Sequence, residues 1–166
     1  MNKTVFWLDE ALKRLLIGLM AAIVLVVCWQ VVSRFILGEP SSMTEEISRT
    51  LLLWIGMLGA ALAYRTGQHL GLDILTSKFA PQWQRRVAIL LTALVVLFAL
   101  AVMVGGGGAL VQLTFELNQM SAALGIRVAW IYLALPLAGF LIAFYGVCQL
   151  ICLWRGDTLT PTGGCE

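Results

Sequence analysis

Four apolar segments constrain this chain more than any other feature. They cover about residues 15–37, 43–64, 87–113 and 128–153. A helix needs about 20 predominantly apolar residues to cross the hydrocarbon core of a bilayer. Every backbone N–H and C=O in that core must be satisfied internally, so segments of this kind cross it as helices. We therefore predict an all-α membrane protein with four transmembrane helices.

The composition agrees with this fold class. Of the 166 residues, 60% are hydrophobic and 12% are charged, whereas soluble domains have about 45–50% apolar and about 25% charged residues. The net charge is +2 and no basic run is interleaved with aromatics, so we expect no nucleic-acid partner. We predict one membrane domain over residues 1–155 and a flexible tail over residues 156–166, which is rich in Thr, Gly and Pro.

The boundaries of the first two helices follow from local signals. No helix breaker precedes the first apolar segment, so we expect one helix from about residue 4 to 37, which must tilt or start in the interface. The Gly-Glu-Pro sequence that ends at Pro40 stops it. Ser42 and Glu45 have the spacing of a capping box. The second helix should therefore begin near Met43.

The connection over residues 65–86 is polar, but apolar residues recur in it at helical spacing, which favours a short interfacial helix. Pro81 suits the first turn of the third helix. Lys and Arg residues set the orientation, because they are enriched in cytoplasmic loops. Eight fall on the side of the termini (Lys3, Lys13, Arg14, Arg65, Lys78, Arg85, Arg86 and Arg155) and three on the other (Arg34, Arg49 and Arg127). We predict that both termini are cytoplasmic.

Small residues recur four apart within the spans, which lets helices approach closely. The pairs are Gly56 with Ala60, Gly59 with Ala63, and Gly139 with Ala143. The run Gly105–Gly108 lies inside the third span. Glycine lowers helix stability by about 1 kcal/mol relative to alanine. The run therefore indicates either close helix packing, which we favour, or a local distortion.

The sequence contains no catalytic or metal-binding pattern. His69 is the single histidine, and Asp73 follows it by one helical turn, which we interpret as a pair in the cytoplasmic loop. Cys148 and Cys152 have no histidine beside them, so we expect no zinc site. We predict no cofactor. A membrane anchor of a respiratory oxidoreductase would need more haem ligands than one histidine, and a homo-oligomeric channel would need a polar stripe along one span.

Charged residues gather where the first two spans approach the membrane surface. Arg34 ends one span, while Glu45, Glu46 and Arg49 begin the next. We predict an ion pair of Arg34 with Glu45 or Glu46 that ties the two helices together. The spacing of Glu45 and Arg49 also suits a pair within one helix. The alternative is that Arg34 extends to lipid headgroups.

Several stretches, taken in order over about residues 10–155, resemble the small membrane subunit of tripartite ATP-independent periplasmic (TRAP) transporters. They are Trp29-Gln30 with Arg34, Glu45-Glu46 with Arg49, Trp54 with Gly56 and Gly59, His69-Leu-Gly-Leu-Asp73, and Leu124-Gly-Ile126 with Trp130, Tyr132 and Pro136-Leu-Ala-Gly139. Arg127 departs from the pattern, which has a proline there, so the geometry of the last outer loop stays open.

The resemblance implies a multi-pass protein of the bacterial inner membrane, not an enzyme. Its implied partners are membrane lipid, a large multi-span subunit that moves substrate and coupling sodium, and a periplasmic substrate-binding protein. The implied substrates are organic acids such as C4-dicarboxylates or sialic acids. The chain would be a scaffold that also helps to dock the binding protein. Glu39, Glu116 and Arg127 are then candidate docking residues, and Trp29, Gln30, Trp54, Gly56 and Gly59 are candidate packing residues.

Overall fold

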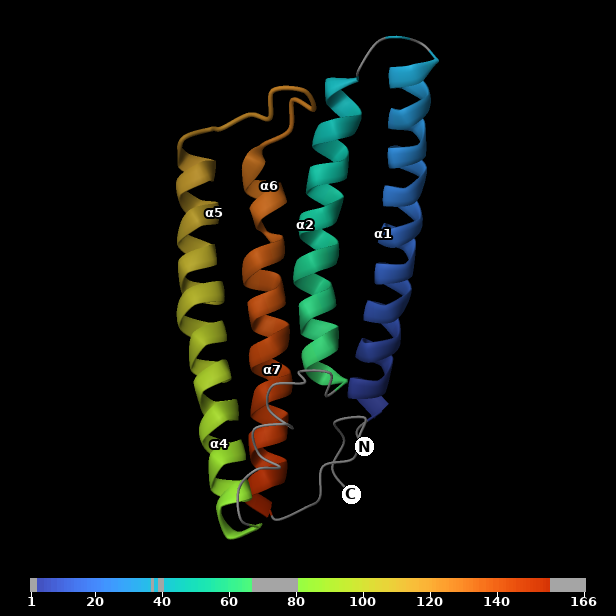
Figure 1. Cartoon of the computed structure of the whole chain (residues 1–166). Coiled ribbons are helices and arrows are strands. Elements are labelled where there is room, and N and C mark those ends of the chain that lie inside the picture. Colours follow the sequence, from blue (N-terminus) through green and yellow to red (C-terminus); the bar gives the residue numbers. More distant parts are fainter. Residues whose placement is uncertain (1–2, 37, 39–40, 67–80, 156–166) are drawn as a thin grey trace.

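The computed structural model describes residues 3–36, 38, 41–66 and 81–155. Its elements are α1 (Lys3–Phe35), α2 (Ser42–Arg65), α4 (Pro81–Phe98), the π-helix η1 (Ala99–Gly106), α5 (Gly107–Glu116), α6 (Val128–Tyr132) and α7 (Ala134–Arg155). They form four rods that are long and apolar enough to cross a membrane, because α4, η1 and α5 are continuous and α6 nearly continues into α7 (Figure 1). The predicted all-α fold with four spans is confirmed.

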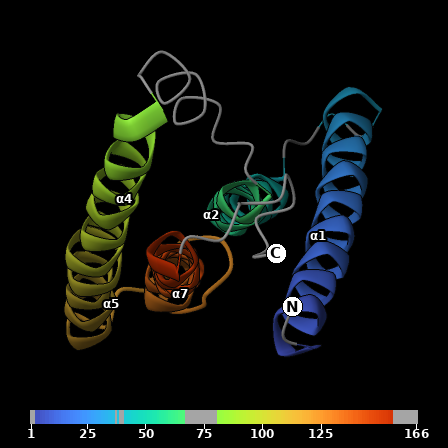
Figure 2. The same cartoon turned by 90° about the horizontal axis from the view of Figure 1, so that it is seen from below.

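The rods lie side by side in an open layer. The order across it is the third span, the fourth, the second and the first (Figure 1). The backbone of α7 contacts α4, η1 and α2, while that of α1 contacts, among the described elements, α2 alone. Seen along the rods, α2 and α7 occupy the middle and α1 and α4 the two flanks (Figure 2). The central pair therefore holds the layer together.

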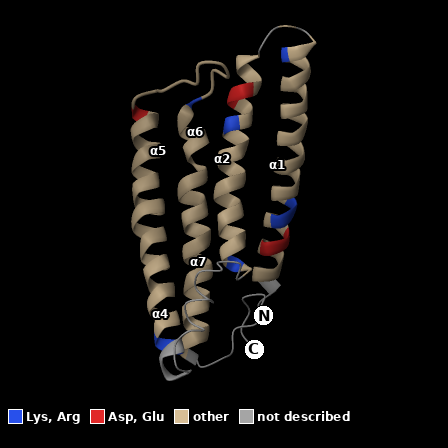
Figure 3. Ribbon diagram, viewed as in Figure 1, with Lys and Arg blue, Asp and Glu red and all other residues tan. Residues whose placement is uncertain are grey.

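The layer has two ends that carry most of the polar groups. We call one the loop end; it contains residues 117–127 and the start of α2. The other is the termini end, which contains the start of α1 and the end of α7 (Figure 1). Charged residues lie toward these two ends and the middle is uncharged (Figure 3). This distribution fits a protein whose middle lies in hydrocarbon.

The helix α1 is continuous over 33 residues. At 1.5 Å per residue it is about 50 Å long, well beyond the hydrocarbon thickness of about 30 Å. The predicted early start of α1, which was based on the lack of a helix breaker before residue 15, is therefore correct. Such a helix must tilt or begin in the interface.

The start of α2 corrects the capping prediction. The N-cap is Ser41, not Ser42, and α2 begins at Ser42, one residue before the predicted start. Ser41 has an extended backbone (φ −83°, ψ 106°), and its Oγ accepts from the Thr44 amide at 3.4 Å. An N-cap residue must be extended so that its side chain can reach these amides. The capping box with Glu45 is therefore absent, and Glu45 pairs elsewhere.

Pro136 interrupts the fourth span. The helix stops after Tyr132 and resumes at Ala134. Proline has no N–H for the carbonyl four residues earlier, and its ring crowds that carbonyl. For Pro136 that residue is Tyr132, so the break falls where the ring acts. The predicted span over residues 128–153 is thus two helices, α6 and α7.

The four glycines of the third span have different roles. They follow or end the π-helical segment Ala99–Gly106, which agrees with the predicted alternative of a distortion. A Cβ at Gly107 would lie 3.0 Å from Leu135 Cδ2 and 3.2 Å from Pro136 Cδ, which agrees with close packing. A Cβ at Gly106 or Gly108 would meet nothing within 4 Å in this chain. Only part of the run therefore serves contact with α7.

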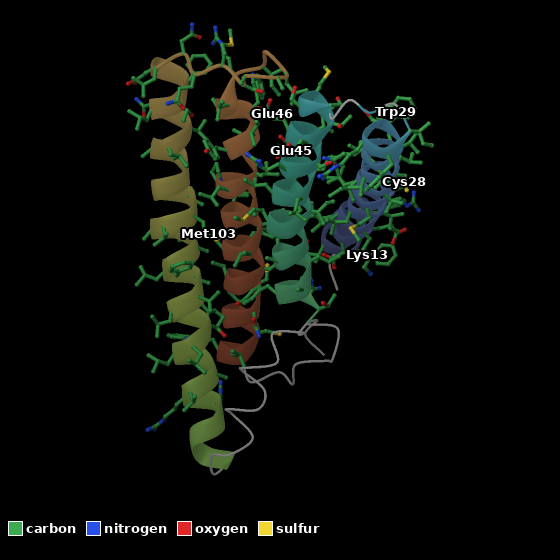
Figure 4. The ribbon with its side chains drawn as sticks, turned by 45° about the horizontal axis from the view of Figure 1, so that its top comes forward. Lys13, Cys28, Trp29, Glu45, Glu46 and Met103 are labelled. Carbon is green, nitrogen blue, oxygen red and sulfur yellow. The ribbon has the colours of Figure 1, made fainter. Side chains whose placement is uncertain are left out.

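Two helices approach closely at Gly139 of α7. A Cβ there would lie 2.5 Å from Met103 Cβ and 3.2 Å from the Ala99 carbonyl oxygen, and Met103 faces α7 (Figure 4). Gly56 and Gly59, which we predicted to be packing positions, have nothing within 4 Å of such a Cβ. Trp29 is 56% exposed. This close approach is therefore between α7 and η1, and among the described residues neither Gly56 nor Gly59 makes one.

Substitution of Gly139 tests this contact. We expect Gly139→Ala to lower the free energy of unfolding by about 1–3 kcal/mol, the usual effect of overpacking, because η1 backbone would have to move. Gly56→Ala is the matched control and should be neutral or stabilising, since alanine favours helix and has free space there. Denaturant titration in detergent, followed by circular dichroism, measures both. Equal stability of the two variants would contradict the packing account.

Candidate functional site

Glu46 anchors the loop end. Its carboxylate accepts a hydrogen bond from the Ser121 hydroxyl. Its Oε2 also accepts from the backbone N–H of Ala123 at 2.9 Å and of Leu124 at 3.2 Å. These donors lie more than 70 residues away in the sequence. One side chain at the start of α2 therefore fixes the connection between the third and fourth spans. We call this set of contacts the Glu46 anchor.

The loop over residues 117–127 is folded so that these donors converge. Ser121 N donates to Ile126 O at 2.8 Å, and Val128 N donates to Gln119 O at 3.0 Å. Gly125 closes the turn with φ +63°, a left-handed conformation that favours glycine. The turn directs the amides of Ala123 and Leu124 to one side, where the carboxylate lies. The turn thus explains why glycine stands between Leu124 and Ile126.

Arg34 does not pair with Glu45 or Glu46 in the described structure, so the predicted ion pair between α1 and α2 is wrong there. Glu45 Oε1 instead accepts from Arg49 Nη2 at 3.1 Å, as the spacing of four residues predicts. Glu46 is occupied by the anchor. Figure 4 shows Glu45 and Glu46 together at the loop end of α2. Each carboxylate thus has a partner other than Arg34.

The candidate docking residues that the structure describes lie at the loop end too. Glu116 ends α5 and accepts from Gln112 Nε2 at 2.9 Å. Arg127 precedes α6, and its guanidinium carbon lies 4.7 Å from the centre of the Phe115 ring. The backbone of Arg127 has φ −69°, a value that proline also adopts. The backbone conformation at this position is therefore compatible with the proline of the family pattern.

A cavity of about 430 Å³ opens beside the Glu46 anchor. Its lining combines Glu45, Glu46 and Arg49 with apolar residues such as Leu53 and Ile131. The lining thus brings both charge signs together at a membrane boundary. Glu39 lies outside the described residues, so its predicted place at this surface is untested.

At the termini end, an ion pair joins α1 to α2. Arg65 Nε lies 3.3 Å from Asp9 Oδ2, and their side chains are only 10% and 19% exposed. The hydroxyl of Tyr145 in α7 donates to Asp9 Oδ1 at 2.7 Å, and the Arg65 guanidinium lies 5.6 Å from the Tyr145 ring centre. Three helices therefore meet at one carboxylate. We call this the Asp9 cluster.

The Asp9 cluster was not predicted from the sequence. A signal existed, because Asp9 is an acidic residue among apolar ones in a segment that continues into a span. Such a group is expected to have a partner. A second link at this end was also missed: Arg85 donates to the carbonyl oxygens of Leu153 and Trp154, each at 3.0 Å. These bonds satisfy carbonyls that a helix C-terminus leaves open.

The remaining predicted residues have simple outcomes. His69 and Asp73 lie outside the described residues, as do most of the predicted interfacial helix and the predicted tail. Gln30 is half-buried beside α2, and Trp54 is half-buried. Among the described residues, no group of three or more His, Cys, Asp or Glu side chains could hold a metal ion.

These features define a class: an all-helical membrane protein with four spans, an uncharged middle and two ends fixed by polar contacts. The family model for tripartite ATP-independent periplasmic transporters, DctQ component, matches residues 23–156. The chain therefore belongs to the DctQ family of small TRAP permease subunits, which are transporter components of the bacterial inner membrane and not enzymes. This result replaces the alternative of a respiratory membrane anchor.

Individual relatives agree with this family. A putative TRAP transporter small permease protein of Haemophilus influenzae is 29% identical over 95% of this chain and 98% of its own length. The sialic acid TRAP transporter small permease protein SiaQ of Vibrio cholerae is 29% identical over 77% of this chain and 72% of its own length. The sialic acid TRAP transporter permease protein SiaT of Haemophilus influenzae is 27% identical over 86% of this chain, but over 22% of its own length.

Proposed function

We propose that this chain is the fixed scaffold of a sodium-coupled importer of organic acids that depends on a periplasmic binding protein. The chain would brace a large membrane subunit that moves the substrate, and its loop end would help to dock the binding protein. The observation that carries the proposal is the contrast between an uncharged middle and two polar ends (Figure 3).

The uncharged middle supports a scaffold role. A protein that moves ions or acids usually lines its path with ionisable groups, which are costly in hydrocarbon. In the described part of the chain, charged side chains lie toward the ends (Figure 3). Transport would therefore need another polypeptide, and a relative of this chain is named as a sialic acid TRAP permease protein.

The uncovered apolar surface supports contact with a large membrane subunit. In the most apolar stretch of the first span, none of the residues is buried within the chain, and in that of the fourth span 39% are buried. The layer leaves two broad faces, and α1 has a neighbour on one side alone among the described elements. Lipid covers such faces in an isolated chain, and packing with a second subunit can replace it.

The charge distribution supports a periplasmic loop end. Eight of the 11 Lys and Arg residues belong to the two termini and the second connection, among them Lys13, Arg14 and Arg65. Cytoplasmic loops are enriched in such residues. The loop end would then face the binding protein. The Glu46 anchor would keep residues 121–124 in one conformation, which lowers the entropy lost on docking.

The substrate class rests on relatives. Two of them are named as sialic acid transporter proteins, and sialic acids are organic acids. The substrate-selecting groups would belong to the other two polypeptides, so we propose the organic-acid class and not one compound.

Co-purification tests the scaffold role. We expect the tagged chain, expressed with the large membrane subunit of its own transporter, to retain that subunit in several mild detergents. In a variant without the native cysteines, single cysteines placed at Gln119, which is exposed in the loop, and at Arg155 should react with an impermeant maleimide from the periplasmic and cytoplasmic sides, respectively. Loss of the large subunit in every detergent would contradict the scaffold role, and the reverse labelling pattern would contradict the orientation.

A further inference from the structure

The cavity between α1 and α2 at the loop end is separate from the contacts of the Glu46 anchor. It encloses about 270 Å³ and is lined by Gln30, Arg34, Ser41, Ser42 and Glu45. All five side chains are polar. Small-molecule sites usually begin at about 300 Å³, so this cavity suits a small polar group. It also lies between two membrane-spanning helices, close to where each ends.

Arg34 supplies positive charge that no carboxylate among the described residues compensates. In the described structure it makes no ion pair, since Glu45 is paired with Arg49 and Glu46 holds the loop. A guanidinium matches phosphate oxygens with two parallel hydrogen bonds. The hydroxyls of Ser41 and Ser42 can donate further bonds. Together these groups favour a phosphate in the cavity.

Glu45 adds a negative group to the same lining. Its Oε1 accepts from Arg49, and a carboxylate can accept additional donors on its other oxygen. A ligand with a phosphate and an ammonium group would therefore satisfy both charge signs. Phosphoethanolamine has an ammonium that donates hydrogen bonds, whereas choline has none to donate and a glycerol headgroup has no positive charge.

The surroundings of the cavity favour a lipid over free phosphate. Beside Arg34, the side chains of Val31 and Phe35 in α1 and of Ile36 directly after it are 51%, 78% and 76% exposed. Apolar groups of this kind can pack against acyl chains while Arg34 extends to the headgroup level. We propose that Arg34, the two serines and Glu45 hold the headgroup of one phosphatidylethanolamine molecule between α1 and α2. The lipid would take the place that we predicted for an ion pair between these helices.

Native mass spectrometry of the delipidated full-length chain tests this site. The probes are phosphatidylethanolamine, phosphatidylglycerol and phosphatidylcholine with the same acyl chains. We expect the wild type to bind one phosphatidylethanolamine at least about tenfold more tightly than phosphatidylcholine, because charge-assisted bonds are strong. Arg34→Ala should weaken the binding of all three lipids, because each of them carries the phosphate, and Arg34→Lys, which keeps the charge without the fork, should keep part of the affinity.

Two further variants sharpen the test. Glu45→Gln should reduce the preference for phosphatidylethanolamine over phosphatidylglycerol, because the ammonium loses its carboxylate. Arg127→Ala, at the same end but directed at Phe115, is the matched control and should bind like the wild type. Circular dichroism confirms that each variant is folded.

Three results would overturn the proposal. The first is equal binding of all three lipids by the wild type, or unchanged binding by Arg34→Ala. The second is displacement by inorganic phosphate or glycerophosphoethanolamine at the concentration of the lipid, which would assign the cavity to a soluble phosphate. The third is absence of the lipid from the complex with the large subunit, together with a crosslink from position 34 to that subunit, which would assign Arg34 to the protein partner.

Discussion

Substitution of Glu46 by alanine is expected to release the loop over residues 117–127. The carboxylate accepts from the Ser121 hydroxyl and from two backbone amides, and no neighbouring side chain replaces it in the described structure. The amides of Ala123 and Leu124 should then exchange hydrogen at least about tenfold faster, since loss of one net hydrogen bond already gives that factor. Hydrogen exchange with mass spectrometry measures the effect directly.

Glu45→Ala is the control for this prediction. Glu45 is adjacent in sequence and has the same charge, but its pair with Arg49 is exposed (63% and 78%), and exposed pairs contribute little. In the Glu45→Ala variant, the amides of Ala123 and Leu124 should exchange as in the wild type. Glu46→Gln keeps one acceptor oxygen and should give an intermediate rate. Equal exchange in Glu46→Ala and Glu45→Ala would show that the carboxylate does not hold the loop.

Removal of the carboxylate from Asp9 is expected to have the largest effect on stability. Arg65 is 10% exposed, and breaking a buried ion pair leaves a charge that has lost its partner. We expect Asp9→Asn to lower the free energy of unfolding by about 3 kcal/mol. The Tyr145 hydroxyl also loses an ionised acceptor. Denaturant titration in detergent, followed by circular dichroism, gives the value.

A double mutant separates the pair from other effects. Asp9→Asn combined with Arg65→Met removes both charges, so the combined loss should be clearly smaller than the sum of the single losses. Glu10→Ala is the control, because its pair with Arg14 is exposed (35% and 74%) and should contribute little. Additive losses in the double mutant, or an equal loss in Glu10→Ala, would contradict a buried ion pair at this position.

The features that the sequence predicted correctly are those with local causes. Four apolar segments are enough to predict four spans, because the bilayer requires length and internal hydrogen bonding of each segment on its own. Pro81 correctly predicted the start of α4, because proline is favoured in the first turn of a helix. The cap of α2 was misplaced by one residue because Ser41 and Ser42 are both good caps, and backbone conformation decides between them.

The polar contacts between helices could not be predicted in this way. Glu46 is satisfied largely by backbone amides 77 and 78 residues away, and every residue offers such an amide, so no side-chain pattern marks the partner. The ion pair of Arg34 was predicted from proximity in the sequence. In the structure, Glu45 pairs with Arg49 and Glu46 binds the loop over residues 117–127. Asp9 and Arg65 are 56 residues apart, and only the packing of α1 on α2 brings them together.

Gly139 illustrates the intermediate case. The sequence predicted it as a packing position from its spacing with Ala143, and the structure confirms a close approach to Met103. The same spacing predicted Gly56 and Gly59, where the chain offers no contact. Spacing identifies faces on which helices can approach, while the order of helices in the layer decides which faces meet inside one chain. The open faces at Gly56 and Gly59 remain for lipid or a second subunit.

We propose that this chain supports transport but does not itself conduct substrate. Uptake of labelled sialic acid or C4-dicarboxylate into proteoliposomes, under an inward sodium gradient and with the cognate binding protein outside, distinguishes the two roles. We expect no uptake above protein-free vesicles with this chain alone, and sodium-dependent uptake once the large subunit is reconstituted beside it. Sodium-driven uptake by vesicles that contain this chain as their sole membrane protein would show that the chain conducts substrate itself.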